Sequence, residues 1–462
     1  MDAVILDVGQ SIAAAIRDNP PGATFILNSG VHREGLLWPK DGQTFIGAPG
    51  AVLSGARVLE GWQREGAVWR RPGLPRPHPP GYGLLTAGRE SGRHLEELFI
   101  DGVRLTRVDA QSDLGPGRWY FDANDGAALI AQDPTGRSVE LSVLGVAFSG
   151  PARNLTIQDL TVEKFATPAQ IGAIHGHEGI GWRILDCIVR WNHGQGINVG
   201  PGALVSGGAV IENGQLGIGG GGANGARIEG VDVARNNAAG YDPYWEAGGI
   251  KISASAAVII ARNHVHHNAG PGIWGDIDMI GTLYEANRVE ENDLNGIMHE
   301  ISQDAVIRCN VLVRNGRVGR DWLLPSQVLI QNSRNVQVER NYVEVGAGSG
   351  NGIVLIQEER GSGARGPRET RDNLVRGNIV VHRDAGGWNG FGTVADASAA
   401  DLWPNRWEAN IYYVPDEGPV HWMFGGVPRH WDELQGRKAF GGTVVQGERR
   451  LVGTTPAVKP PC

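Results

Sequence analysis

Asparagine recurs at nearly regular intervals through the middle of the chain. One series, with spacings of 21, 23, 32, 24 and 23 residues, consists of Asn192, Asn213, Asn236, Asn268, Asn292 and Asn315. A second series, with spacings of 24 and 23 residues and then longer gaps, consists of Asn263, Asn287, Asn310, Asn341 and Asn378. Asparagine tolerates the left-handed conformation of tight corners, and stacked copies can hydrogen-bond to one another. Two series with one period predict a solenoid whose coils stack on their neighbours.

A short phrase also occurs twice in residues 270–302, with the two copies 24 residues apart. The segments GIWGD (272–276) and GIMHE (296–300) both run from glycine and isoleucine through two variable residues to a carboxylate. This length corresponds to about one coil of a parallel β-helix, in which adjacent strands are about 4.8 Å apart. We therefore expect Asp276 and Glu300 to lie one above the other.

Side-chain alternation along the strands predicts which residues face outward. Within each strand we count positions from the corner glycine, so that the residue after it is position 1. Position 1 is always isoleucine, at residues 197, 218, 250, 273 and 297, so the odd positions of this count face the core. Ile252, Ile277 and His299 also fall on odd positions. The even, outward positions are Asn198, Lys251, Trp274, Asp276, Asp278, Met298, Glu300 and Ser302. This register predicts one stack of Lys251, Trp274 and Met298, and a neighbouring stack of Asp276 and Glu300.

The stacked carboxylates are the candidate catalytic residues. Two stacked acids repel, so one of them should have a raised pKa, as a general acid requires. Like charges placed opposite each other without a purpose are destabilising. Lys251, one of only five lysines in the chain, falls beside this pair. We predict Asp276 and Glu300 as catalytic, with a set of substrate-binding residues that comprises Asn198, Trp245, Glu246, Lys251, Trp274, Asp278, His299 and Gln331.

Two groups of histidines have a structural interpretation. His299 is at an inward position, so a buried packing role competes with its role in substrate binding. His264, His266 and His267 are spaced as metal ligands often are, but alternation sends the first two to one face and His267 to the other. We interpret these three as structural and predict no metal ligands.

Four segments are expected along the chain. Residues 1–56 contain a capping helix near 11–17 and the first coils, and residues 57–149 form an inserted antiparallel β-module with Asp-Gly and Asn-Asp-Gly turns. Residues 150–400 form the main parallel β-helix, and residues 401–462 form the last coil and a capping tail. Insertions at 239–247, 316–327 and 358–371 should form loops on the binding face.

Composition and charge exclude several classes of function. The net charge is −8 with no basic block, which disfavours nucleic acid as a partner. No run of 18 apolar residues and no signal-like N-terminus occurs, so we expect no membrane partner and a cytoplasmic location, or secretion if a signal was removed. Cys187, Cys309 and Cys462 have no metal-ligand spacing and imply no disulfide framework. The oligomeric state is not indicated.

The coil phrases GPGIWGDIDMIGT (270–282) and GIMHEIS (296–302) resemble the catalytic coils of right-handed parallel β-helix glycoside hydrolases, in particular the family 120 β-xylosidases. In that family an Asp after an Ile-Trp element is the nucleophile, and a Glu one coil later is the acid/base. The resemblance maps these roles onto Asp276 and Glu300 and matches the family's inserted β-sandwich to residues 57–149. The segments WEAGGIK (245–251) and LWPNRWEANIY (402–412) are similar to the wider bacterial β-helix repeat group. The chain departs from the family at Asp278 and His299.

These observations predict an enzyme that hydrolyses glycosidic bonds in an oligosaccharide or glycoside, without a cofactor. Carboxylates one coil apart fit the roughly 5–5.5 Å separation of retaining enzymes, and loop-rich surroundings suggest exo action. The alternative is a polysaccharide lyase, with Lys251 as base and Ca²⁺ held by Glu246, Asp276, Asp278 and Glu300. A cleft with four acids would repel a uronate unless that metal were bound. A non-catalytic glycan-binding solenoid is the third possibility.

Overall fold

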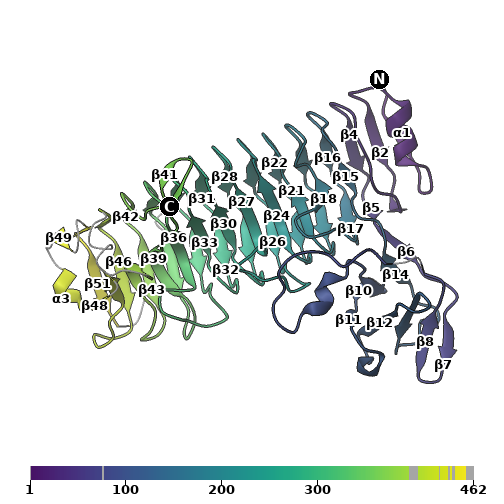
Figure 1. Cartoon of the computed structure of the whole chain (residues 1–462). Helices are drawn as coiled ribbons and strands as arrows, with labels where there is room; N and C mark the ends of the chain where they lie inside the picture. Colours follow the sequence, from purple (N-terminus) through teal and green to yellow (C-terminus); the bar gives the residue numbers. More distant parts are fainter. Residues whose placement is uncertain are drawn as a thin grey trace. The chain divides into compact units, whose positions relative to one another are not determined.

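The computed structural model describes residues 2–74, 77–394, 404–425, 427–434, 438–439, 443–453 and 462. The chain divides into two compact units. The first comprises Met1–Asn198, Ala209–Gly219 and Asn237–Glu246, and the second comprises Val199–Gly208, Gly220–Asn236 and Ala247–Cys462. Short β-strands dominate both units, which confirms the predicted all-β class (Figure 1).

A capped helix lies near the start of the first unit, between two parallel strands in the sequence. Strand β1 (Val4–Leu6) precedes helix α1 (Ile12–Asp18) and pairs in parallel with β2 (Thr24–Leu27). The Ser11 hydroxyl accepts a hydrogen bond from the Ala14 N–H, and the Glu34 carboxylate accepts from the Ile12 and Ala13 N–H groups. These acceptors satisfy amides that have no partner within the helix. The predicted capping helix is confirmed, although one strand precedes it.

An antiparallel β-module follows in the same unit, between β5 (Ala51–Ser54) and β15 (Phe148–Ser149). One sheet has the order β10-β9-β14-β6, and the other has the order β11-β12-β13-β8-β7, in which only β11 and β12 are parallel. Their core includes Leu98, Trp119, Ile130 and Leu141. The strands are β6 (Ala56–Val58), β7 (Gln63–Glu65), β8 (Val68–Arg71), β9 (Leu98–Ile100), β10 (Val103–Arg104), β11 (Thr106–Val108), β12 (Arg118–Asp122), β13 (Ala127–Ile130) and β14 (Val139–Ser142).

The coils begin before the module and continue after it in the first unit: β4 (Thr44–Gly47), β5 and β15 each pair in parallel with a strand of the next coil. That coil consists of β16 (Thr156–Gln158), β17 (Thr161–Glu163) and β18 (Gly172–His175). These strands pair in parallel with β19 (Arg183–Leu185), β20 (Ile188–Arg190) and β21 (Gln195–Asn198) of the next coil. The same pattern fills the second unit.

Three parallel sheets run through the second unit (Figure 1). The first contains β22 (Leu204–Ser206), β25 (Arg227–Glu229), β28 (Ile259–Ala261), β31 (Leu283–Glu285), β34 (Val306–Arg308), β37 (Gln337–Glu339), β42 (Leu374–Arg376) and β45 (Arg406–Glu408). The second contains β26 (Asp232–Ala234), β29 (His264–His266), β32 (Arg288–Glu290), β35 (Val311–Val313), β38 (Tyr342–Val345), β43 (Ile379–His382) and β46 (Ile411–Val414). The third contains β27 (Gly248–Ser253), β30 (Ile273–Asp276), β33 (Ile297–Glu300), β36 (Ser326–Gln331), β39 (Asn351–Gln357), β44 (Asn389–Thr393) and β47 (Trp422–Phe424).

Both asparagine series form hydrogen-bonded ladders at the corners of the coils. In the second unit, the Oδ1 of Asn292 accepts from the backbone N–H and the side-chain amide of Asn268 at 3.0 and 2.9 Å. Its own amide donates to the Val265 carbonyl and to Asn315 Oδ1 at 3.0 and 2.8 Å. Gln327 takes the place of asparagine at the next position of the ladder. Its Oε1 accepts hydrogen bonds from the backbone N–H and the side-chain amide of Asn315. The ladders thus satisfy backbone groups that a buried corner would otherwise leave without partners.

Replacement of Asn292 by Ala should lower the free energy of unfolding by about 2 kcal/mol, because it leaves buried donors of Asn268 without acceptors. Urea denaturation at neutral pH measures this change. Gln337→Ala is the matched control, because that amide is exposed on β37, and its effect should stay within about 0.5 kcal/mol. Equal effects of the two variants would show that the ladder contributes no stability.

Two further features concern the cysteines and the helices. Cys309 and Cys462 form a disulfide, which the sequence did not lead us to expect, and Cys187 is a buried free thiol whose pKa burial raises to about 12. Within the described part of the chain, no helix has the length and apolar character needed to cross a membrane.

Candidate active site

The predicted catalytic residues lie on neighbouring strands of the third sheet in the second unit. Asp276, the last residue of β30, is directly opposite Glu300, the last residue of β33. Lys251 of β27 is opposite Trp274, which in turn is opposite Met298. The register therefore confirms both predicted stacks.

Alternation on these strands separates a packed inner face from an outer face. Ile273 and Ile297 are fully buried in the interior of the coils. Gly275 also points inward, and a Cβ at this position would overlap the Tyr284 hydroxyl. The glycine in the IWGD phrase therefore leaves space for that tyrosine, and Asp276 emerges on the opposite face.

His299 belongs to the inner face. Its ring is fully buried, and one ring nitrogen lies 3.0 Å from the Tyr284 hydroxyl. Burial lowers the pKa of His299 to about 3, so the imidazole is neutral at physiological pH. The inward direction predicted from register is confirmed, and the inclusion of His299 among the substrate-binding residues was wrong.

Asp276, the candidate nucleophile, forms an ion pair with Lys251, which also makes a cation–π contact. Lys251 Nζ lies 3.0 Å from Asp276 Oδ2, and both side chains are nearly buried. The same ammonium lies 3.6 Å from the centroid of the Trp274 ring, within the range of a cation–π interaction. Because an unpaired charge is costly when it is desolvated, this ion pair offsets part of the cost of burying Lys251 and Asp276.

Glu300 has the electrostatic surroundings of a general acid. Its side chain is 7% exposed, and its Oε1 lies 3.4 Å from a guanidinium nitrogen of Arg360. Burial and, secondly, the negative charge of Asp276 raise the pKa of Glu300 to about 7, against the opposing effect of Arg360 and Lys251. A carboxyl with this pKa is protonated in a large fraction of molecules at neutral pH.

A cluster of buried apolar side chains adjoins the pair on the outer face of the third sheet. Trp274 and Met298 belong to it together with Leu323, Leu329, Val354, Ile356 and Met423, and the partly buried Trp322, Leu324 and Trp388 pack against it. Trp322 comes from the insertion at 316–327, which was expected to form a loop on the binding face. The cluster therefore combines a tryptophan from a strand with aromatic rings from loops.

Some predicted ligands in the second unit occupy other positions. Gln331, at the end of β36, is opposite Glu300 and buried, so it extends the stack of polar residues. Asp278 follows the end of β30, where both Ile277 and Asp278 have positive φ angles of 44° and 58°. Alternation ends at this turn, so the prediction that Ile277 faces the core was wrong, and its side chain is 40% exposed.

Asn198, Trp245 and Glu246 belong to the first unit, where they have local partners. The Asn198 amide donates to Gln195 Oε1 at 2.8 Å. The Trp245 ring packs edge-on against Tyr82 with a centroid distance of 5.9 Å. Glu246 is half-buried, and its backbone N–H donates to the Asp242 carbonyl. Their roles in substrate binding stay predictions.

Sequence reasoning missed Arg360, which lies in the insertion at 358–371 and also pairs with Glu358 at 2.8 Å. The insertion itself was recognised from the repeat spacing, but nothing in its sequence indicates which of its arginines reaches Glu300.

The structure also bears on the acids of the lyase alternative. Within the described part of the second unit, Asp276, Asp278 and Glu300 do not form a converging group of potential metal ligands.

Known proteins share this architecture. Residues 172–323 match the family described as the right handed beta helix region, which agrees with the predicted fold. XylC, solved in complex with xylose, is similar over 95% of this chain and 83% of its own, with a TM-score of 0.70 and 18% identity. The A-module of the Azotobacter vinelandii mannuronan C-5 epimerase AlgE6 has a TM-score of 0.54 and 13% identity over 95% and 93% of the two chains. A glycoside hydrolase has a TM-score of 0.50 and 10% identity over 97% of each chain.

No curated protein sequence matches the chain significantly. At these low identities, the structural similarity establishes a right-handed parallel β-helix, a fold on which several carbohydrate enzymes are built.

Proposed function

We propose that the chain is a retaining glycoside hydrolase, with Asp276 as nucleophile and Glu300 as acid/base. The observation that carries the proposal is the placement of the two carboxylates on directly paired residues of β30 and β33, with the pKa of Glu300 raised to about 7. Strands in this arrangement are about 4.8 Å apart, which suits the roughly 5–5.5 Å carboxyl separation of retaining enzymes.

The first step uses the two acids in different protonation states. The carboxylate of Asp276, which is paired with Lys251, attacks the anomeric carbon while Glu300 gives its proton to the leaving oxygen. A covalent glycosyl ester forms at Asp276, and the aglycone leaves as an alcohol. The buried setting favours this division of roles because it raises the pKa of Glu300.

The second step follows from a change in charge. Once Asp276 is esterified, it no longer carries the negative charge that helps raise the pKa of Glu300. The pKa of Glu300 therefore falls, and its carboxylate can remove a proton from the water that attacks the ester. Hydrolysis releases the sugar with retained configuration and returns the proton to Glu300.

The surroundings also suggest the kind of substrate. The partly buried Trp322 and Trp388, which pack against the cluster that contains Trp274, offer apolar faces against which a sugar ring can stack. The side chains of Asp276 and Glu300 are only 11% and 7% exposed, which favours exo action on a terminal sugar over binding along a polymer. XylC was solved with xylose, so a xyloside is the first substrate to test.

A panel of nitrophenyl glycosides that starts with the xylosides tests this function, and NMR of the first sugar released identifies its anomer. We expect turnover with retention, and release of the inverted anomer would contradict the double displacement. Unsaturated products that absorb in the ultraviolet, with activity lost in chelator, would instead support the lyase. Glycan binding without turnover would support a binding solenoid.

Replacement of Arg360 by Met should move the basic limb of the pH profile of kcat/KM upward by about half a unit. The positive charge of Arg360 lowers the pKa of Glu300, so its removal lets that pKa rise further and keeps the acid protonated at higher pH. Arg371→Met is the control, because Arg371 lies in the same insertion but pairs with Glu369 and Asp372. A downward shift, or the same shift in both variants, would contradict this role of Arg360.

A further inference from the structure

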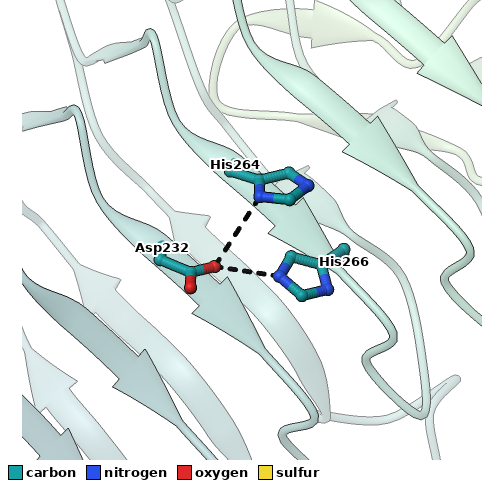
Figure 2. A group of neighbouring side chains, drawn as sticks. All are labelled: Asp232, His264 and His266. Atoms are coloured by element: carbon teal, nitrogen blue, oxygen red, sulfur yellow. Dashed lines mark hydrogen bonds and ion pairs between the residues drawn. The ribbon is translucent and has the colours of Figure 1, made fainter.

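A second cluster of polar residues lies on the outward face of the second sheet of the second unit. Asp232 opens β26 and is directly opposite His264, the first residue of β29. His266 is two residues further along β29 and is opposite Glu290 of β32. Alternation places His264 and His266 on one face, as predicted, and Figure 2 shows a ring nitrogen of each histidine linked to the same carboxylate oxygen of Asp232.

The three side chains converge as ligands of one ion would. Asp232 Oδ1 lies 3.0 Å from His266 Nε2 and 4.0 Å from His264 Nδ1, and the ligand atoms all lie within 4.8 Å of one another. In a tetrahedral zinc site with bonds of about 2.0–2.1 Å, neighbouring ligand atoms are roughly 3.3 Å apart. Small side-chain rotations are therefore sufficient to give all three atoms a shared bonding distance.

The outer hydrogen bonds of both imidazoles support the same interpretation. His264 Nε2 lies 2.8 Å from Glu290 Oε1, and Glu290 is itself held by Arg288 at 3.0 Å. His266 Nδ1 lies 2.8 Å from His267 Nδ1. Metal-bound histidines typically donate their second ring N–H to such acceptors, which fixes the tautomer and turns the lone pair of the other nitrogen toward the metal.

The tautomer that this arrangement gives to His264 is informative. When Nε2–H donates to Glu290, the lone pair of His264 Nδ1 faces the carboxylate of Asp232. A proton or a metal cation between the two acceptors satisfies both lone pairs. The side chains of Asp232 and His264 are 48% and 42% exposed, so an ion can enter from solvent and keep water as a further ligand.

We propose that Asp232, His264 and His266 bind one divalent transition-metal ion, of which Zn²⁺ is the best fit, and that this ion links two adjacent coils. Two imidazoles and one carboxylate suit zinc, nickel or copper better than calcium or magnesium, which prefer oxygen ligands. His264 and His266 then do more than the packing role first assigned to them. The site involves none of the residues proposed for glycoside hydrolysis.

Calorimetric titration of the metal-stripped full chain with Zn²⁺ tests the proposal, with metal analysis after dialysis to count bound ions. We expect one Zn²⁺ per chain, and Asp232→Asn and His266→Gln should each weaken binding by at least about tenfold. Saturating Zn²⁺ should raise the Tm of the wild type by about 2 °C or more and leave that of the variants unchanged. His177→Gln is the matched control, because it removes an exposed histidine outside the cluster.

Co²⁺ offers an independent readout, since visible absorption bands of a tetrahedral site should appear in the wild type and disappear in Asp232→Asn. Glu290→Gln tests the outer hydrogen bond to His264 without removing a ligand, and it should weaken Zn²⁺ binding about tenfold. Circular dichroism verifies that each variant is folded. The proposal is overturned if the wild type binds no Zn²⁺, or if folded Asp232→Asn and His266→Gln bind it as tightly as His177→Gln does.

Discussion

Replacement of Asp276 by Asn is expected to lower kcat/KM on an aryl glycoside by about 10⁴-fold or more, because an amide cannot form the glycosyl ester. The substitution keeps the size of the side chain, so the loss reports on the carboxylate and not on packing. It also removes the negative charge that Lys251 contacts at 3.0 Å. Steady-state rates on the best substrate of the nitrophenyl panel measure the effect.

Glu285→Gln is the matched control for Asp276→Asn. Glu285 lies on β31, the strand that follows Asp276 along the chain, but it belongs to another sheet and pairs with Arg308 at 2.6 Å. Its replacement should leave kcat/KM within about twofold of the wild type, since surface substitutions away from a site change little. A wild-type rate in Asp276→Asn would remove Asp276 from the mechanism.

Glu300→Gln should show a loss that depends on the leaving group. With an aglycone that needs protonation, the rate should fall by about 10²–10⁴-fold, which is the typical contribution of a general acid. With a dinitrophenyl leaving group, the first step should be nearly unchanged, and added azide should restore turnover by attacking the ester without a base. A uniform loss across all leaving groups, without rescue by azide, would mean that Glu300 acts in another way.

The coil architecture could be predicted from the sequence because its determinants are local and repeated. Asn268, Asn292 and Asn315 recur at the coil period, and each of the first two hydrogen-bonds to the next asparagine of the series. The stacking of Asp276 on Glu300 follows from the same period together with the two-residue alternation of strands. A register that buries one face leaves no alternative pairing, because a one-residue slip would expose the isoleucines.

Features that depend on turns, loops and long-range contacts could not be predicted from the repeat. Alternation was extended to Ile277, but the backbone enters the left-handed region there, and the side chain turns to solvent. The contact between Glu300 and Arg360 joins residues 60 positions apart, and the disulfide joins Cys309 to Cys462 across 153. Such pairs are set by loop paths that no period encodes.

The proposed metal site on β29 could be predicted only in part from the sequence. Their shared face was predicted from alternation, but the third ligand, Asp232, comes from the neighbouring coil, 32 residues before His264. That interval contains the insertion at 239–247, so the 24-residue period did not bring Asp232 and His264 into register. Only the strand pairing shows that the carboxylate stands beside both rings.

Glu300→Gln is also expected to stabilise the folded protein above neutral pH, by about 3 kcal/mol at pH 8. The folded-state pKa of Glu300 is about 7, against an ordinary value of 4.5. Below the ordinary value the carboxyl is protonated in both states and imposes no penalty. As the pH rises through 7, the folded protein must ionise a buried carboxyl beside Asp276, so the stability that the neutral form allowed is lost.

Glutamine stays neutral at every pH, so its advantage over Glu300 should be small near pH 4 and should grow until the pH exceeds 7. Urea unfolding of both proteins at pH 5 and pH 8 measures it, and the difference between them cancels the parallel trend from Glu448, whose pKa burial also raises to about 7. Glu358→Gln, which neutralises the other carboxylate paired with Arg360, should show no such pH-dependent gain. A Glu300→Gln variant that is less stable than the wild type at pH 8 would mean that the carboxylate is stabilised where it lies, and a residue in that state would be a poor general acid. An advantage that grows with pH would instead show that the burial of Glu300 lowers the free energy of unfolding. The same burial keeps the carboxyl protonated, so that it can donate a proton to the leaving group.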